Sequence, residues 1–555
     1  MEEYSTSSSS NNDSNSMKKL CDSFKLKVCS FSSSSWKSNR FSATTASLLL
    51  FFLFICTLVF TRWSDISTLA SSSGSFTFLM FSNHNKQEYP KRDEYLLNCT
   101  SSNMTITCPS NYPPTSNHPF TSNETCPEYF RWIHEDLKTW NKKGITREMV
   151  ESLKDVTHFR LVIVNGTAYV KRYAKAFQTR DTYTFWGILQ LLKLYPGRLP
   201  DLDLVFQCHD QASIKKDKYK GRKAAFAPPQ FHYCGDDSTF DIVFPDWSFW
   251  GWPDINIKPW VPLEKDFKEG NAMKNWTSRE PYAFWKGNLH TGPRQKLGKC
   301  NSVNDWNAKI VNQNWGKEVA EGFKNSDLSK QCTHRYKIYM EGNAWSVSEK
   351  YILACDSMTL LVNPVYYEFF TRSLIPMKHY WPVNPNNLCR SIKFAVNWSN
   401  NNTDKAQEIG KEGSKFIFDQ IKMQSVYDYM FHLLDGYAKL LRYRPTVPEG
   451  AIDLCSEKFA CSPMGLETTY KKETMVNGPS EKGPCKLPPP YDPQTLKSIH
   501  KQNAKIKEVV EMWEKGSGKP GHGPGWPACR PARPEFKHAR HEVQLPCHGP
   551  CHGQG

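Results

Sequence analysis

Residues 336–362 constrain the fold of this 555-residue chain more than any other stretch. Residues 336–340 have the composition of a strand, and a turn of small residues follows them. Ser346 stands three residues before Glu349, which is the spacing of a capping box, and an apolar run comes next. Residues 358–362 have the composition of a second strand. A strand, a turn, a capped helix and a strand form a βαβ unit, so an α/β core is predicted.

The N-terminus of the helix in this unit is a candidate anion site. The first N–H groups of a helix have no partner within it, and the helix dipole favours negative charge there. A bound phosphate would accept hydrogen bonds from these N–H groups and would carry the negative charge that the dipole favours. An ordinary βαβ connection without a ligand explains the stretch equally well, so neighbouring motifs have to distinguish the two.

The net charge of +16 does not indicate a nucleic-acid partner. The basic residues are scattered, and no zinc-finger, helix-turn-helix or RNA-binding signature accompanies them. Anionic donor molecules or acidic glycans suit such a surface better than a duplex.

An uncharged apolar run at residues 43–60 is long enough to span a bilayer as one helix. Basic residues precede it, which favours a cytosolic N-terminus. A cleaved signal peptide would begin nearer Met1 and end in small residues. We therefore expect a single-pass type II anchor, with everything beyond Arg62 in the lumen of the secretory pathway.

Potential N-glycosylation sites beyond the anchor agree with this topology. They are Asn98, Asn103, Asn123, Asn165, Asn275, Asn397 and Asn401. The chain ends without a Lys/His-Asp-Glu-Leu signal, so the Golgi membrane is favoured over the endoplasmic reticulum.

Composition and patterning divide the chain into seven segments. The expected division is a disordered cytosolic tail (1–42), the anchor (43–60), a lumenal stem (61–125), a first α/β domain (126–262), a second α/β domain with closing helices (263–445), a Pro-rich extension (446–515) with one short helix near 505–514, and a low-complexity tail (516–555).

Asp210 is a candidate general base. It follows an apolar strand predicted at residues 202–206, and functional groups of α/β folds gather at the C-terminal ends of strands. A carboxylate there can accept a proton from a reacting hydroxyl. An Asp that only caps the loop is the simpler alternative.

Two further stretches have candidate binding roles. Residues 244–250 gather aromatic side chains, whose faces stack on sugar rings, although packing in the core is the alternative. Arg294 ends a turn of small residues after a strand, where its guanidinium is able to grip phosphate oxygens. A solvated turn Arg is the plainer interpretation of that residue alone.

No metal site is expected. Asp201 and Asp203 have the Asp-x-Asp form of metal-dependent sugar-nucleotide enzymes, but they precede their strand, so a loop is predicted. Cys547 and Cys551 resemble half of a zinc site, without a second pair of ligands.

Five motifs occur in an order that resembles the Rumi-type protein O-glucosyltransferase family, and most of all its plant branch. They are Cys-Pro-Glu-Tyr-Phe from Cys126, His209-Asp210, Phe244 to Trp250, Phe284-Trp-Lys-Gly with Arg294, and Gly342 to Lys350. The resemblance extends from Cys126 to Pro445, and the tail at 516–555 has no counterpart in it.

The resemblance implies a GT-B fold, in which two Rossmann-like domains face each other across the active-site cleft. Residues 126–262 would form the acceptor side, and residues 263–445 would bind the UDP-sugar. It implies an inverting transfer of glucose or xylose, from UDP-glucose or UDP-xylose, without a metal ion or other cofactor. The acceptor would be a hydroxyl of a secreted protein or of a cell-wall polysaccharide.

The functional residues of the family fall on definite positions of this chain. The catalytic base falls on Asp210, and the resemblance also supports a disulfide between Cys332 and Cys355. Acceptor contacts fall on Phe244, Pro245, Asp246, Trp247, Ser248, Phe249 and Trp250. Donor contacts fall on Asn288, Arg294, Asn343, Ala344, Trp345, Ser346, Val347 and Ser348.

The chain departs from the animal members of the family at the donor residues. Asn288 stands where those members have Ser, and Ser348 stands where they have Arg, so glucose and xylose both stay open. Gln211 follows Asp210 where Pro is common. Glycoside hydrolysis fits less well, because it needs two carboxylates that flank one bond. A sugar-binding module or an inactive homologue is the alternative from another class.

The predicted topology is testable in microsomes. A glycosidase that removes N-glycans should lower the apparent mass of the expressed protein, because the sequons lie in the lumen. Protease added outside sealed microsomes should trim only residues 1–42, as followed by immunoblotting of a C-terminal tag. Digestion of the folded head under these conditions would contradict the type II anchor.

Overall fold

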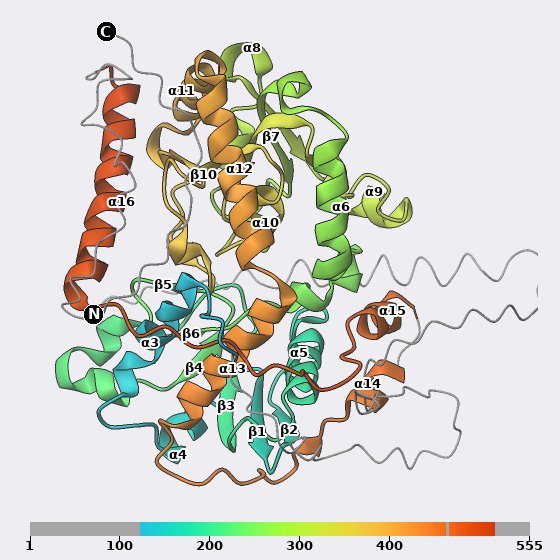
Figure 1. The fold of residues 1–555 in the computed structure, drawn as a ribbon, viewed down its shortest axis with the longest axis vertical. Helices are drawn as coiled ribbons and strands as arrows, with labels where there is room; N and C mark the ends of the chain where they lie inside the picture. The colour runs from blue at the N-terminus through green and yellow to red at the C-terminus, as the bar shows by residue number, and fades with distance from the viewer. Residues whose placement is uncertain (1–121, 462–464, 517–555) are drawn as a thin grey trace, which may run out of the picture. The chain divides into compact units, whose positions relative to one another are not determined.

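The computed structural model describes residues 122–461 and 465–516 (Figure 1), all within one unit defined by its internal contacts. Within these ranges, no helix has the length and apolarity that crossing a membrane requires. The anchor predicted at 43–60, the tails and most of the stem lie outside the described residues.

Six strands form a first sheet in the order β13-β2-β1-β3-β4-β6. β1 and β2 are the hairpin that Asn165-Gly166 predicts, and both turn residues have positive φ, 49° and 77°. β1 also pairs antiparallel with β3, whereas β3, β4 and β6 are parallel. The bounds are β1 Phe159–Val164, β2 Thr167–Arg172, β3 Leu202–Phe206, β4 Gln230–His232, β6 Ile242–Val243 and β13 Ile452–Asp453.

The second sheet is parallel throughout, in the order β12-β10-β9-β7-β8. β9 and β10 are the two strands expected at 336–340 and 358–362. β9 is the central strand, and β7 lies between β9 and the edge strand β8. The bounds are β7 Glu280–Gly287, β8 Ala308–Asn312, β9 His334–Tyr339, β10 Met358–Val362 and β12 Trp381–Val383.

The connections after β7 and β9 lie on opposite faces of this sheet. Leu297 of α7 (Arg294–Gly298) packs with Ile338 of β9 in one apolar cluster. Ile352 of α10 packs with Tyr339 of β9 in another. Because neighbouring residues of a strand point to opposite faces, the sheet is doubly wound. Its switch point, where such folds bind ligands, lies between the C-terminal ends of β7 and β9.

Helix α10 (Ser348–Leu353) begins later than the capping-box spacing predicts. Its N-cap is Val347, whose side chain makes no capping bond, and the Glu349 N–H donates to the backbone carbonyl of Ser346. The Ser346 hydroxyl instead shares a hydrogen bond of 2.9 Å with the Ser348 hydroxyl. A helix of six residues has a small dipole, so the predicted anion site has to depend on other groups as well.

The chain returns to the first sheet after the second is complete. The closing helices expected at the end of the second domain include α12 (Thr403–Gln420) and α13 (Met423–Ala438). α12 lies against β10, whereas α13 lies against β3 (Figure 1), where the Tyr437 hydroxyl donates to the Asp203 carbonyl at 2.9 Å. The boundary predicted at 262/263 falls inside α6 (Trp260–Ala272), which leads into the second half.

The loop expected at Asp201 and Asp203 is wrong for Asp203, which is the second residue of β3 and is fully buried. Both of its carboxylate oxygens accept from Arg160, at 2.7 and 2.6 Å, and Tyr443 donates to one of them at 2.9 Å. These partners supply the charge and hydrogen bonds that a buried carboxylate needs. Asp203 is therefore a structural residue.

Residues 446–515 are integrated into the fold. β13 extends the first sheet, α14 (Ser456–Cys461) packs on α5 (Arg180–Leu194), and Cys485 is bonded to Cys126. α16 (Pro493–Glu514) starts well before the helix expected near 505. The Asp492 carboxylate accepts from the N–H groups of Gln494 and Thr495, both at 3.0 Å, so an Asp-Pro helix start was readable in the sequence.

Disulfides and glycosylation sites agree with an oxidising compartment. Cys332 is bonded to Cys355, as the resemblance implied, and Cys300 is bonded to Cys389. The sequon asparagines within the described ranges are all exposed, namely Asn123, Asn165, Asn275, Asn397 and Asn401. Asn98 and Asn103 lie outside these ranges.

Replacing Cys332 and Cys355 together by Ala should lower the free energy of unfolding by about 3 kcal/mol, because the bond closes a loop of moderate length in the unfolded chain. Chemical denaturation under oxidising conditions measures the difference. Cys208→Ala is the control, because Cys208 is buried but free, and its loss should cost about 1 kcal/mol of packing. Peptide mapping that finds Cys332 and Cys355 as free thiols would contradict the assignment.

Candidate active site

Asp210 lies just after β3, at the C-terminal edge of the first sheet. Its side chain is 41% exposed, and its Oδ1 accepts a hydrogen bond of 2.9 Å from Nη1 of Arg180, which is 10% exposed. The same nitrogen donates to the Cys208 carbonyl, also at 2.9 Å. Arg180 thus fixes both the turn after β3 and the orientation of the carboxylate.

Arg180 is a site residue that the sequence did not reveal. It is the first residue of α5, where the helix dipole opposes a positive charge, so the adjacent Asp210 accounts for its position. Its guanidinium lies over the Trp247 ring, 4.6 Å from the centroid. Among the described residues its Nε has no hydrogen-bond partner. Nothing local in the sequence links this Arg to an Asp thirty positions away.

Asn343 forms the contact between the second sheet and Asp210. It follows β9, and its Nδ2 lies 3.4 Å from Oδ2 of Asp210, which makes a long hydrogen bond. Gln211 Nε2 donates to the backbone carbonyl of Asn343 at 3.0 Å. Because Arg180 holds Oδ1, it is Oδ2 that faces the loop after β9. Asp210 and the 343–348 loop, predicted separately, therefore meet at one place.

Arg294 stands on the other side of the switch point, at the start of α7. Its Nε and Nη2 donate to the Met340 carbonyl at 3.3 and 3.2 Å, and the guanidinium lies over the Trp285 ring. Burial lowers the pKa of Arg294, while Tyr339 and Asp210 oppose this shift electrostatically. Arg294 and Asp210, which come from different sheets, are therefore within electrostatic reach of each other.

A glycine permits this close approach. Gly292 has φ of +51°, and a Cβ at that position would collide with the carbonyl oxygen of Gly342. The turn before Arg294 therefore packs directly on the turn after β9, at the C-terminal ends of β7 and β9.

The other predicted donor residues differ in exposure. Asn343 is exposed, Ala344 and Trp345 are buried, and Ser346, Val347 and Ser348 are half-buried. Asn288 is half-buried, and its Oδ1 accepts from the His290 N–H at 2.8 Å. The structure gathers these residues around the switch point, with Arg294 and the 343–348 loop on its two sides.

Residues 244–250 form a packed segment rather than an open loop, and all seven are buried. Trp247, Phe249 and Trp250 are each 1% exposed or less. Trp250 donates to the Tyr427 hydroxyl at 2.9 Å, and its ring fills the space beside Gly187 of α5, where a Cβ would collide with it. Packing in the core, the alternative raised from the sequence, describes these rings. Their contact with an acceptor stays a prediction.

Two buried histidines beside the Asp210 turn are uncharged at neutral pH. Burial lowers the pKa of His158 to about 4, and the charges of His209 and Arg180 act in the same direction. Burial lowers the pKa of His232 to about 3, and Arg180 again contributes. These side chains leave Arg180 to balance the negative charge of Asp210.

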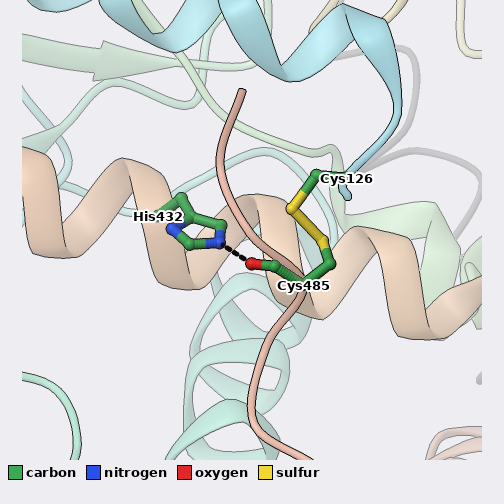
Figure 2. A group of neighbouring side chains, drawn as sticks. All are labelled: Cys126, His432 and Cys485. Carbon is green, nitrogen blue, oxygen red and sulfur yellow. Dashed lines mark hydrogen bonds between the residues drawn. A yellow bond between two sulfur atoms is a disulfide. The ribbon is translucent and has the colours of Figure 1, made fainter. Parts of the chain in front are cut away.

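Among the described residues, one group has the spacing of a metal site: Cys126, His432 and Cys485. The two sulfurs form a disulfide, and the His432 ring is hydrogen-bonded to the Cys485 carbonyl oxygen (Figure 2). The Nε2–O distance is 2.7 Å. Zinc is bound by thiolates, so the bonded sulfurs make this group structural.

A pocket lies on the face of the second sheet that α10 covers. Its space of about 610 Å³ includes open solvent, so it is a shallow and partly open pocket. Its lining includes Ser348, from the predicted donor loop, and does not include Asp210. Other lining residues are Phe284, Lys286, Gln313, Trp315 and Lys337.

Comparisons with known proteins show which family and which proteins this chain resembles. A family model described as "Glycosyl transferase family 90" matches residues 121–514, which include both sheets and the Asp210–Arg294 site. Protein O-glucosyltransferase 1 of Bos taurus is 28% identical over 59% of this chain and 84% of its own length. The O-glucosyltransferase rumi homolog of Anopheles gambiae is 27% identical over 56% of this chain and 78% of its own length. O-glucosyltransferase rumi of Drosophila melanogaster is 25% identical over 60% and 82%.

Proposed function

Because the chain belongs to glycosyl transferase family 90, we propose that it transfers glucose or xylose from a UDP-sugar to a hydroxyl group. The motif resemblance to the Rumi-type O-glucosyltransferases is confirmed by the family match and the relatives. The names of those relatives favour glucose and a protein acceptor. A cell-wall glycan is the second acceptor class, as the plant-like motifs suggest.

The strongest support for this function is the approach of Asp210 to the Arg294 side of the second sheet. A carboxylate whose Oδ2 accepts a long hydrogen bond from Asn343 lies within electrostatic reach of a guanidinium at the switch point of a doubly wound sheet. Phosphate-bearing ligands bind at such switch points. We place the UDP diphosphate between Arg294 and the N–H groups of the 343–348 loop. The pocket bordered by Ser348 adjoins this loop, and we place the nucleoside there.

In the proposed reaction, Oδ2 of Asp210 takes the proton from the acceptor hydroxyl. The hydroxyl oxygen attacks the anomeric carbon from the face opposite UDP and forms the new C–O bond. The bond between that carbon and the β-phosphate oxygen breaks, and its electron pair leaves with UDP. The anomeric configuration is inverted, and Arg180 keeps Asp210 oriented throughout by its hydrogen bond to Oδ1.

The charge that develops on UDP needs a positive partner. Arg294 supplies a full positive charge, and the backbone N–H groups of the 343–348 loop supply hydrogen bonds. These groups support a transfer that does not depend on a divalent cation. Two sheets that meet at one site suit a GT-B arrangement. We also propose a Golgi location through the anchor at 43–60.

Asp210→Asn should bind UDP like the parent and release UDP from UDP-glucose at least about a hundredfold more slowly. The amide preserves size and hydrogen bonding but takes up no proton at neutral pH. His209→Asn is the matched control, because it alters the exposed neighbouring side chain, and it should keep the parental rate. Near-parental turnover of Asp210→Asn would make this residue a loop cap. A parent protein that releases no UDP with any UDP-sugar would favour a non-catalytic module.

Arg294→Ala should weaken UDP binding at least about tenfold, because it removes a charged donor from the diphosphate. Isothermal titration calorimetry with UDP measures the affinity. Lys296→Ala removes an exposed positive charge from the same helix, α7, and should leave the affinity unchanged. An equal loss of UDP affinity in both variants would mean that UDP responds to positive charge in general rather than to Arg294. Parental affinity of Arg294→Ala would show that the donor site lies elsewhere.

A further inference from the structure

Two segments that carry predicted site residues are joined by a buried ion pair. Asp246 belongs to the segment 244–250, which follows β6 of the first sheet. Lys350 belongs to α10, directly after the 343–348 loop of the second sheet. The Lys350 Nζ lies 2.8 Å from Oδ2 of Asp246, and both side chains are 0% exposed.

Each partner of this pair also holds its own segment. The Lys350 Nζ donates to the Val347 carbonyl at 3.3 Å, so it ties down the end of the 343–348 loop. Oδ1 of Asp246 accepts from the Ser248 N–H at 2.8 Å and shapes the turn of the aromatic segment. Burial opposes a charge on Lys350, yet Asp246, with smaller contributions from Tyr351 and Glu368, raises its pKa overall. A pair removed from water in this way requires well-defined geometry.

Further contacts reinforce the junction. The Tyr351 hydroxyl donates to the Ser248 hydroxyl at 2.9 Å. Trp345, inside the donor loop, packs edge-on against Trp247, with ring centroids 6.2 Å apart. The loop and the helix that follows it are thus held to the aromatic segment through Trp345, Lys350 and Tyr351.

Two other buried carboxyl groups, Glu349 and Glu368, interact electrostatically with Lys350. Burial raises the pKa of both groups. Among the described residues, Asp246 is the carboxylate that forms the ion pair with the Lys350 Nζ.

We propose that Asp246 and Lys350 are positioning residues, which set the distance between the donor loop 343–348 and the half of the site that carries Asp210. This proposal rests on the donor role of that loop. It gives the segment 244–250 a function that buried side chains can perform: the segment fixes where the 343–348 loop lies relative to the first sheet. An error of about 1 Å in the placement of reacting groups costs on the order of a hundredfold in rate.

The test removes both charges together, because Lys350→Met alone would leave Asp246 buried without a partner and unfold the protein. Asp246→Asn combined with Lys350→Met keeps the size of both side chains and the acceptor for the Ser248 N–H. Steady-state UDP release from UDP-glucose, with water as acceptor, gives kcat and KM per folded molecule. We expect the double variant to fold, with kcat/KM at least about tenfold below the parent.

Arg160→Met combined with Asp203→Asn is the matched control. It neutralises another buried ion pair, which lies between β1 and β3 within the first sheet. The control should change the melting temperature but not kcat or KM. Tyr351→Phe, which deletes only the hydroxyl bond to Ser248, is the milder variant, and it should lower kcat/KM by a smaller factor with no loss of folding.

Parental kcat and KM in both Asp246→Asn/Lys350→Met and Tyr351→Phe would overturn the proposal and leave the pair a stability element. A matching loss of kcat in the Arg160/Asp203 control would overturn it as well. If the double variant does not fold, Tyr351→Phe decides alone. A parent protein without UDP-glucose binding would instead reject the proposed function, whatever the variants do.

Discussion

The doubly wound order of the second sheet determines where the rest of the site can form. β7 and β9 are neighbours, and the chain leaves them toward opposite faces, so the helices that follow do not cover the edge between their C-terminal ends. Arg294 follows β7 and the 343–348 loop follows β9, which places both beside this opening. Asp210 follows β3 of the other sheet and meets Asn343 there. Three strand ends thus supply the proposed base, the proposed donor-binding cation and the loop beside them.

Ion pairs give this junction its precision. Arg180, which is itself buried, orients the carboxylate of Asp210, the proposed base, and the buried pair of Lys350 with Asp246 holds the proposed donor loop against the first sheet. Charges removed from water are tolerated only where partners and hydrogen bonds are in place, so the Lys350–Asp246 pair admits few arrangements. The C-terminal part of the chain strengthens the same frame, because α13 crosses back onto β3 and Cys485 is bonded to Cys126.

Local signals in the sequence predicted much of the fold and pointed to several of the candidate site residues. The Asn165-Gly166 pair predicts the hairpin of β1 and β2, and apolar runs predict β3 and β10 with their observed bounds. These elements are predictable because strand and turn preferences depend on a few neighbouring residues. Asp210 and Arg294 could be singled out from the sequence because they follow predicted strands. Arg180, and the pairing of Asp246 with Lys350, depend on tertiary contacts that leave no local pattern. For the same reason the aromatic segment looked like an open binding loop, although it packs between the sheets.

The most direct test of this account is a crystal structure of the protein with UDP bound. The account predicts that the diphosphate lies between the Arg294 guanidinium and the N–H groups of residues 343–348, with its free end directed toward Oδ2 of Asp210. Loss of the Arg294 contact to Met340 in favour of phosphate oxygens would fit this result. Density for UDP elsewhere on the protein, with the β7/β9 opening empty, would contradict it.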